Sequence, residues 1–251
     1  YSTTSPTNQN VTVTIRANKK IQNVNGWNLS EDKTTLTKEY TANTSAEGEK
    51  IIVKDLDGNT TKEDIIIKIT NIDKTVPEAN IEYSTTTLTN QDVIATITSD
   101  EEIQGVEGWE LSADKKTLTK KYTANETESV TIKDLVGNST TVSVKIENID
   151  KEAPTVSIEY TPTSSTNQNV TVTITANEKV QQIEGWTISE DEKKLTKTYA
   201  ANQKETIKII DLAGNITTKE IIVDNIDKTE VQAIVKYSTT LKTNKNVEVT
   251  I

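Results

Sequence analysis

The stretch TNQNVTVTITANE at residues 166–178 decides the fold class. Its apolar residues alternate with threonine, as in Val170, Val172 and Ile174. A period of two is typical of a β-strand that buries one face and exposes the other to water. The rest of the chain shows the same alternation, and no segment of useful length has the spacing of an amphipathic helix. The sequence therefore predicts an all-β protein.

The alternating strand belongs to a longer unit that recurs along the chain. A tyrosine precedes each occurrence of the strand, and a Gly-Trp pair follows it in every complete unit. These residues are Tyr1, Tyr83, Tyr160 and Tyr237, together with Trp27, Trp109 and Trp186. Self-similarity at a nearly fixed period indicates one folding unit copied in tandem. Short antiparallel strands separated by turn signals favour a small β-sandwich for each unit.

Strand positions follow from the alternation in the middle unit. We expect strands at 79–83, 92–98, 102–106, 117–123, 129–134 and 140–147. An extended array in which each unit enters at one end and leaves at the other needs an odd number of strands. A seventh strand is therefore expected where the chain turns back at 109–112.

Unit boundaries are marked by a recurring NIDK motif. Proline follows this motif at Pro77 and Pro154, and because proline cannot donate to a strand ladder it marks a break between sheets. We expect repeat 1 at 1–75 without its first strand, repeat 2 at 76–152, repeat 3 at 153–229, and the first two strands of a truncated fourth repeat at 230–251. The chain is interpreted as a window cut from a longer array.

Composition excludes several classes of function. The 251 residues carry a formal net charge of -10 and contain neither His nor Cys. Nucleophilic sites that depend on imidazole or thiol, and zinc sites built from nitrogen and sulfur ligands, are therefore excluded. The basic residues are too scattered for nucleic-acid binding, and no apolar run reaches the roughly 20 residues of a membrane span. We expect no enzymatic activity, no nucleic-acid partner and no membrane insertion.

Each repeat contains the motif DLxGN, which has two interpretations. It appears as DLDGN at 55–59, DLVGN at 134–138 and DLAGN at 211–215. Glycine followed by asparagine suits a tight turn, and the aspartate can accept backbone N–H groups within it. Alternatively, the aspartate is a calcium ligand, although calcium takes six to eight oxygen ligands and one aspartate cannot supply them.

The predicted strand order brings further acids toward two of these turns. The loop after the second strand and the DLxGN turn share the end that faces the preceding repeat. We expect one cluster of Asp73, Glu101, Glu102 and Asp134, and another of Asp150, Glu178 and Asp211. Crowded carboxylates repel one another unless a cation separates them. Either calcium binds between the repeats, or the acids are solvated and pair with Lys74 and Lys151; no other cofactor is expected.

Two sets of apolar residues are given structural roles. The tryptophans lie beside inward-alternating residues in a chain that has no Phe, which favours core filling over stacking on a sugar. The linker residues Ile72, Ile149 and Ile226 stand between polar neighbours. We expect them to wedge between consecutive repeats, with the last core position of a repeat as the alternative.

These motifs in fixed order resemble the bacterial immunoglobulin-like repeats of Gram-positive surface proteins. The resemblance rests on TNQNVTVTITANE, on GW followed by LS and LTK with a tyrosine, on DLAGN, and on NIDK with AP, and it covers the whole chain. It implies tandem immunoglobulin-like β-sandwich domains in an extended array, located outside the cell on a bacterial surface. The family has no shared catalytic residues.

The function that the resemblance implies is a stalk or spacer that projects a functional domain away from the cell. Its partners would be the neighbouring repeats of the same chain. Two alternatives stay open: the repeats bind a host or matrix ligand as adhesin modules, or they associate with one another into a surface filament. The few aromatic residues, 3 Trp and 7 Tyr, favour the spacer over the adhesin.

Overall fold

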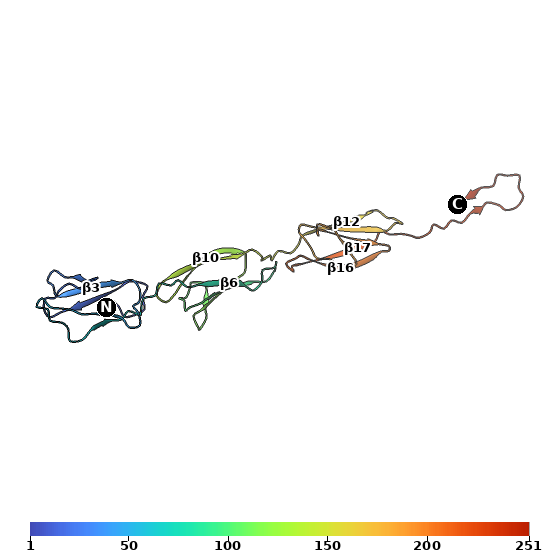
Figure 1. The fold of residues 1–251 in the computed structure, drawn as a ribbon. Helices are drawn as coiled ribbons and strands as arrows, with labels where there is room; N and C mark the ends of the chain where they lie inside the picture. The colour runs from blue at the N-terminus through green and yellow to red at the C-terminus, as the bar shows by residue number, and fades with distance from the viewer. Residues whose placement is uncertain (251) are drawn as a thin grey trace. The chain divides into compact units, whose positions relative to one another are not determined.

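The computed structural model describes residues 1–250, and every regular element in that range is a β-strand (Figure 1). The all-β prediction is thus confirmed. No helix among these residues is long and apolar enough to cross a membrane. The chain divides into two compact units, residues 1–87 with 92–148 and residues 88–91 with those from 149 onward.

The first unit begins with two small sheets. One has the order β1-β3-β2 and is formed by β1 (Val11–Arg16), β2 (Asn28–Leu29) and β3 (Thr35–Tyr40). The other pairs β4 (Glu49–Ile51) with β5 (Ile65–Ile67). Apolar residues of both sheets, among them Val11, Leu36 and Ile67, form one buried cluster.

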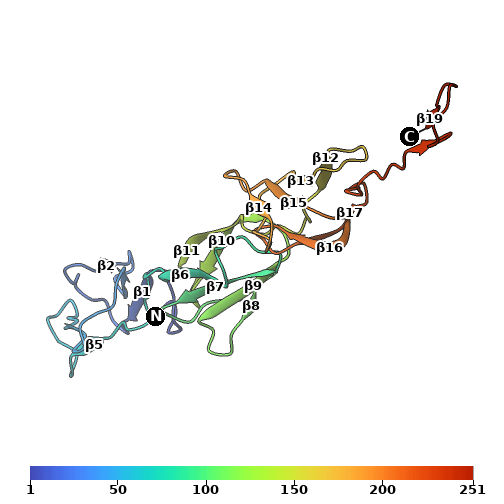
Figure 2. The ribbon, with the colours of Figure 1, turned by 90° about the vertical axis from the view of Figure 1, so that its right-hand side faces the viewer.

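The same unit continues with a fuller version of this arrangement. A four-stranded sheet of order β6-β7-β9-β8 contains β6 (Ala79–Tyr83), β7 (Val93–Ser99), β8 (Glu110–Leu111) and β9 (Thr117–Tyr122), and a second sheet pairs β10 (Glu126–Lys133) with β11 (Ser139–Ile146) (Figure 2). Strand β8 lies within the segment where a seventh strand is predicted. The other strands follow the predicted positions closely, with one exception.

The predicted strand at 102–106 is wrong. Only Ile103 forms a bridge there, with Asp134. Its N–H donates to the carbonyl of Lys115, just before β9, whereas the next N–H, of Gln104, donates to Lys133 in β10. Consecutive residues thus bond to two different sheets, so the segment crosses between the sheets and cannot form a ladder in either.

The second unit repeats the plan. Its four-stranded sheet of order β12-β13-β15-β14 contains β12 (Val156–Thr161), β13 (Val170–Ala176), β14 (Thr187–Ile188) and β15 (Lys194–Tyr199); β16 (Gln203–Ile210) pairs with β17 (Ile216–Val223), and β18 (Lys236–Tyr237) with β19 (Val249–Thr250). The β13–β15 register places Ile174 opposite Leu195.

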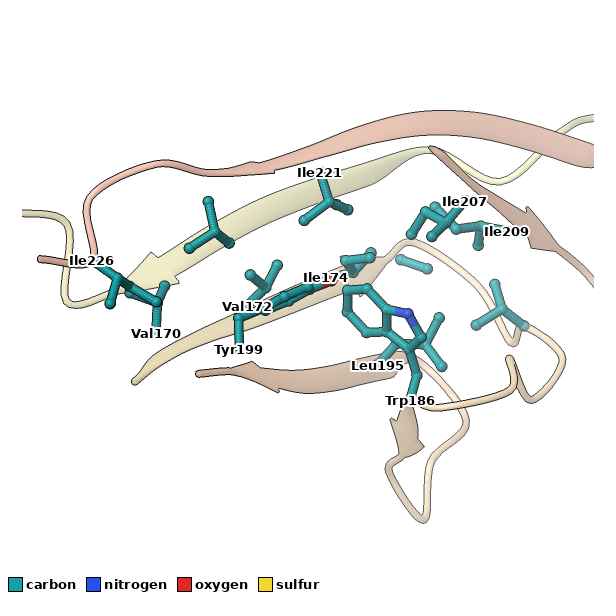
Figure 3. Packing of buried hydrophobic residues seen from close by; sticks show 13 residues of the cluster. Val170, Val172, Ile174, Trp186, Leu195, Tyr199, Ile207, Ile209, Ile221 and Ile226 are labelled. Carbon is teal, nitrogen blue, oxygen red and sulfur yellow. The ribbon is translucent and has the colours of Figure 1, made fainter. Parts of the chain in front are cut away.

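The core of this unit lies between its two larger sheets. Trp186 and Leu195 face Ile207, Ile209 and Ile221 across it (Figure 3). Full burial of an aliphatic side chain of this size contributes about 1.5–3 kcal/mol. The tryptophans of all three repeats are at most 9% exposed, which confirms their prediction as core residues.

A polar clamp joins the two sheets of each repeat. In the second unit, Lys197 and Tyr199 of β15 meet Glu205 of β16. The Lys197 Nζ lies 2.8 and 2.9 Å from the two carboxylate oxygens, and the Tyr199 hydroxyl donates to the same carboxylate. The ammonium also lies 5.0 Å from the Tyr199 ring centroid and 5.8 Å from that of Trp186. Corresponding clamps are Lys38, Tyr40 and Glu49, and Lys120, Tyr122 and Glu128.

The clamp changes the proton affinity of its acid. Burial raises the pKa of Glu205, but the hydrogen bonds from Lys197 and Tyr199 outweigh burial, so the pKa lies below its ordinary value. Burial and the hydrogen bond to Glu205 raise the pKa of Tyr199. Because the folded state prefers ionised Glu205, this stabilisation is present above the ordinary glutamate pKa of 4.5 and is lost as the pH falls below it.

Replacing Glu205→Gln should destabilise the sheet pair by about 1.5–3 kcal/mol, since hydrogen bonds to a charged group are lost. Amide hydrogen exchange of residues 194–223 measures the effect, with 117–146 of the same molecule as an internal reference. The matched control Glu220→Gln breaks an exposed ion pair with Lys204 and should change stability by less than about 0.5 kcal/mol. Equal effects of the two substitutions would contradict a stabilising clamp.

Candidate functional site: two carboxylate clusters

The DLxGN motif forms a tight turn organised by its aspartate. Asp134 Oδ1 accepts from the backbone N–H groups of Val136, Gly137 and Asn138 at 2.9, 2.5 and 2.8 Å. Gly137 has φ +99°, a left-handed conformation that glycine adopts at low cost. Asp134 is 1% exposed. Three donated N–H groups therefore compensate the charge of a buried carboxylate.

The asparagine of the motif ties this turn to the preceding NIDK segment. The amide nitrogen of Asn138 donates to Asp134 Oδ2 at 2.8 Å and to the Asp73 carbonyl at 3.0 Å. Asn215 makes the same two bonds, to Asp211 Oδ2 at 2.8 Å and to the Asp150 carbonyl at 3.0 Å. The linker aspartates are thereby held next to the turn aspartates.

Two groups of three carboxylates result, and within each group one oxygen per residue lies within 4.8 Å of the others. They are Asp73, Glu101 and Asp134 in the first unit, and Asp150, Glu178 and Asp211 in the second. The structure thus brings together the predicted residues except Glu102, which forms an ion pair with Lys115 at 3.4 Å. Whether a metal binds to these groups stays a prediction.

The third acid of each cluster carries an electrostatic cost. Burial raises the pKa of Glu101, and the charges of Asp134 and Asp73 raise it further. The pKa of Glu178 is raised in the same way, by burial and then by Asp150 and Asp211. A nearby positive charge would relieve this repulsion.

A lysine near the clusters is one source of that charge, and a metal ion is the other. Lys116 lowers the pKa of Glu101 through its charge, while its Nζ donates to the Asp100 carbonyl at 2.6 Å. Lys74, an expected partner of the acids, donates instead to Asn10 Oδ1 at 2.6 Å. The cluster therefore keeps more negative than positive charge close by.

The donor set fits a partly hydrated calcium ion. Calcium takes six to eight oxygen ligands, carboxylates among them. Asp73 and Glu101 offer carboxylate oxygens, whereas Asp134 offers chiefly Oδ2, because Oδ1 already accepts three N–H groups. Three carboxylates would leave the remaining positions to water. The ion would supply charge neutralisation and a link between a linker and a turn.

Repeat 1 provides an internal comparison. Its residue at the position of Glu101 and Glu178 is Lys19, whose Nζ lies 3.6 Å from Asp55 Oδ2 in the first DLxGN turn. Hydrogen bonds from Asn59 and the charge of Lys19 lower the pKa of Asp55. A lysine meets the turn aspartate here, whereas a third acid does so in the other two repeats.

Two of the three linker isoleucines are core residues of a repeat rather than wedges. Ile72 and Ile226 belong to the buried cores of the repeats that they follow. The side chain of Asn43 holds Ile72 there, since Oδ1 accepts from its N–H at 2.8 Å and Nδ2 donates to its carbonyl at 2.9 Å. The alternative interpretation, the last core position, describes both residues.

Two features of the site were not predicted: the bond from Asn138 or Asn215 to the linker carbonyl, and the asparagines that fix the linker isoleucines. The sequence signal for the first is the Asn that ends every DLxGN motif. An asparagine after glycine is already typical of a turn, so its second bond leaves no separate mark in the sequence.

Comparisons with known proteins add little to this geometry. No family model matches the chain, and no curated protein matches it. A solved structure described as a crystal structure with xylogluco-oligosaccharide matches with 13% sequence identity over 86% of this chain and a TM-score of 0.28. The chain spans 56% of that structure's length. A likeness of this size indicates neither a shared fold nor a shared ligand.

If the clusters hold calcium, the thermal midpoint should be higher in excess calcium than in chelator, since a ligand that binds only the folded state stabilises it. Calcium at about 100 times its dissociation constant would add about 2.7 kcal/mol per site. Glu101→Gln together with Glu178→Gln should abolish the difference, whereas Glu102→Gln should leave it unchanged. An unchanged midpoint in the unsubstituted chain would rule out calcium binding at both clusters.

When chelator removes calcium, the raised pKa of Glu101 should make folding stability depend on pH in the opposite sense to the lowered pKa of Glu205. The folded state retains a proton that the unfolded state releases, so stability should fall as the pH rises from the ordinary pKa of 4.5 toward the raised value. Glu101→Gln should remove this decline and stabilise repeat 2 at neutral pH by up to about 1 kcal/mol. Hydrogen exchange of residues 92–146 across this pH range checks both statements.

Proposed function

We propose that this chain is a non-catalytic spacer segment of a bacterial cell-surface protein. In this proposal, immunoglobulin-like β-sandwich repeats at 1–75, 76–152 and 153–229 follow one another in an extended array and project a functional domain. The proposal rests on one observation above all. Equivalent asparagines of two repeats donate to the linker carbonyl: Asn138 to that of Asp73 and Asn215 to that of Asp150, at 3.0 Å in each case.

This bond favours a spacer because it restrains the linker. A flexible tether would leave the NIDK segment solvated, whereas here Asn138 fixes Asp73 from the following turn. In the second unit a backbone bond from the N–H of Asn90 to the carbonyl of Ala213, 3.0 Å long, adds to that from Asn215. A recurring restraint at equivalent positions is what a stiff row of repeats requires.

The chemistry of the side chains supports the same proposal. Two of the partly or fully buried acids serve structural contacts: Glu205 closes a clamp between sheets, and Asp211 organises a turn. A carboxylate catalyst would instead need two acids facing a substrate cleft with their proton affinities driven apart. Within residues 1–250, Glu205 and Asp211 instead meet a lysine, a tyrosine and the N–H groups of a turn.

Calcium would strengthen a spacer of this kind. An ion at Asp73, Glu101 and Asp134 would link a linker to the next turn across the same connection that Asn138 makes. Extracellular calcium modules commonly bind with dissociation constants of about 10⁻⁴–10⁻³ M. The spacer would then be stiffest where calcium is plentiful, which fits a location outside the cell.

Small-angle scattering tests the array directly. Strands rise about 3.3 Å per residue, so three repeats with their loops placed end to end should span on the order of 110 Å. Asn138→Ala with Asn215→Ala should shorten the mean length by loosening both linkers. Asn59→Ala is the matched control, because Asn59 bonds Asp55 in its own turn. A compact particle of half the expected length would refute the extended spacer.

A further inference from the structure

Repeat 2 has an uncovered strand edge in its second sheet. That sheet consists of β10 and β11 alone, because the segment at 102–106 meets β10 only briefly. Gln104 donates its N–H to the Lys133 carbonyl at 2.8 Å, and the next residues to pair, in β8, belong to the other sheet. A cavity of about 330 Å³ opens beside this bond, lined by Gln104, Gly105, Val106, Thr131 and Lys133.

The backbone of β10 is oriented to receive another strand at this edge. Lys133 directs its carbonyl toward Gln104 and away from β11, and alternate residues of a strand direct their N–H and C=O groups to the same side. Thr127, Ser129 and Thr131 therefore do the same. Within residues 1–250, no backbone hydrogen bond from outside the β10–β11 hairpin reaches these three residues.

The other edges of repeat 2 are shorter or better covered. On the far side of the same sheet, the N–H of Lys145 in β11 donates to the Tyr83 hydroxyl at 3.1 Å. In the four-stranded sheet, the edge strands β8 and β6 have two and five residues, and short edge strands offer little for another sheet to pair with. Within residues 76–152, the eight-residue β10 therefore presents the longest open edge.

The side chains of this edge suit pairing of β10 with a copy of itself. Thr127, Ser129 and Thr131 are exposed and uncharged. In an antiparallel pair centred on Ser129, the two Ser129 residues lie opposite each other, and Thr127 lies opposite Thr131 of the second molecule. Each of these pairs would exchange two N–H···O bonds. The register also keeps the buried Val130 and Ile132 on the inner face of the sheet.

The equivalent edge in repeat 3 carries charges that oppose such pairing. Strand β16 has lysines at two of the three edge positions, Lys204 and Lys208, with Thr206 between them. The same register would place Lys204 opposite Lys208 of a second molecule, and like charges directly opposite one another are destabilising. Lysines on an edge strand are a common protection against association between sheets. In repeat 1 the corresponding strand β4 has only three residues.

We propose that β10 of repeat 2 pairs antiparallel with β10 of a second molecule of this chain, across a two-fold axis at Ser129. The two hairpins would then form one continuous sheet of order β11-β10-β10-β11. Main-chain hydrogen bonds supply the affinity in strand addition of this kind. Because the same patch is used on both molecules, the contact closes at a dimer.

The dimer contact is separate from the features on which the spacer proposal rests. It uses neither the linkers nor the carboxylate clusters, so it can fail or hold independently of the spacer function. One strand from each molecule buries less surface than a standard protein interface, and the association should therefore be weak and reversible.

Sedimentation equilibrium of the 251-residue chain tests the pairing. The mean mass should rise between micromolar and millimolar concentrations and level off at twice that of one chain. Ser129→Lys places two lysines opposite each other at the two-fold axis and should weaken association at least about tenfold. A chain that stays monomeric at millimolar concentration overturns the proposal, as does growth beyond a dimer.

Ser143→Lys is the matched control for this substitution. Ser143 is also exposed and lies opposite Ser129 in β11, one strand away from the proposed contact. The control adds the same charge to the same sheet face and should have little effect on association. Equal effects of the two lysines would show that charge, rather than its place at the edge, weakens association and would overturn the proposal.

Hydrogen exchange locates the contact. The N–H groups of Thr127, Ser129 and Thr131 should exchange more slowly in millimolar than in micromolar solution, whereas that of Thr206 in β16 should exchange equally fast in both. Concentration-dependent protection elsewhere, without protection of these three groups, would place the contact on another surface and overturn the proposal.

A reverse experiment moves the contact to repeat 3. In a chain that carries Ser129→Lys, the further changes Lys204→Thr and Lys208→Thr remove the opposed charges from β16. This chain should regain association, with slowed exchange at Thr206. If it stays monomeric, charge does not decide which edge pairs, and the proposal is overturned.

Discussion

The alternation of buried and solvated side chains along the second strand of each repeat is the constraint on which the rest depends. In β13, Val170, Val172 and Ile174 are at most 1% exposed, and the threonines between them face the other way. This strand lies at the centre of its sheet, and the opposite sheet packs on its apolar face through Ile209 and Ile221. Because a shift of one residue would turn every apolar side chain to solvent, the alternation also fixes the register of the neighbouring strands. The register in turn places the clamp: Lys197 and Tyr199 leave β15 on the inner side, where Glu205 of β16 can reach both.

Electrostatics then acts on a framework already set by packing. The buried turn aspartates are tolerated because backbone N–H groups surround one of their oxygens, as at Asp211, which accepts from Gly214 and Asn215. That compensation serves one carboxylate and leaves the two neighbouring acids to repel each other. Repeat 1 has Lys19 at the position of Glu101 and Glu178, so this position accommodates either a positive or a negative side chain. An acid there is costly in isolation, so its occurrence in two repeats favours a role in binding a cation over a role in folding.

Periodicity predicted the strands well, because the pattern of β7 or β11 is local and reports burial directly. It failed at 102–106, where the apolar Ile103 and Val106 resemble a strand but Ile103 and Gln104 bond to different sheets. Periodicity also missed the clamps, because in a sequence a lysine and a glutamate several residues apart are typical of solvent-exposed positions. The carboxylate clusters could be predicted because the strand count places two loops at the same end of a repeat. The spacing of residues along the chain does not determine the distances between these acids or whether they bind an ion. The repeat boundaries and the immunoglobulin-like assignment also stay predictions.

In the second unit, the first strand of the repeat both covers the edge of the second strand and continues directly from the linker. It covers the edge of the second strand, as β12 covers β13, and an uncovered edge is a site where sheets of different molecules pair. The same segment begins directly after the linker, where Pro154 is held by Thr217 and Asp150 by Asn215. A repeat therefore protects its own edge only when the linker before it is in place. Displacing the linker would therefore release β12 and expose the edge of β13 in one step.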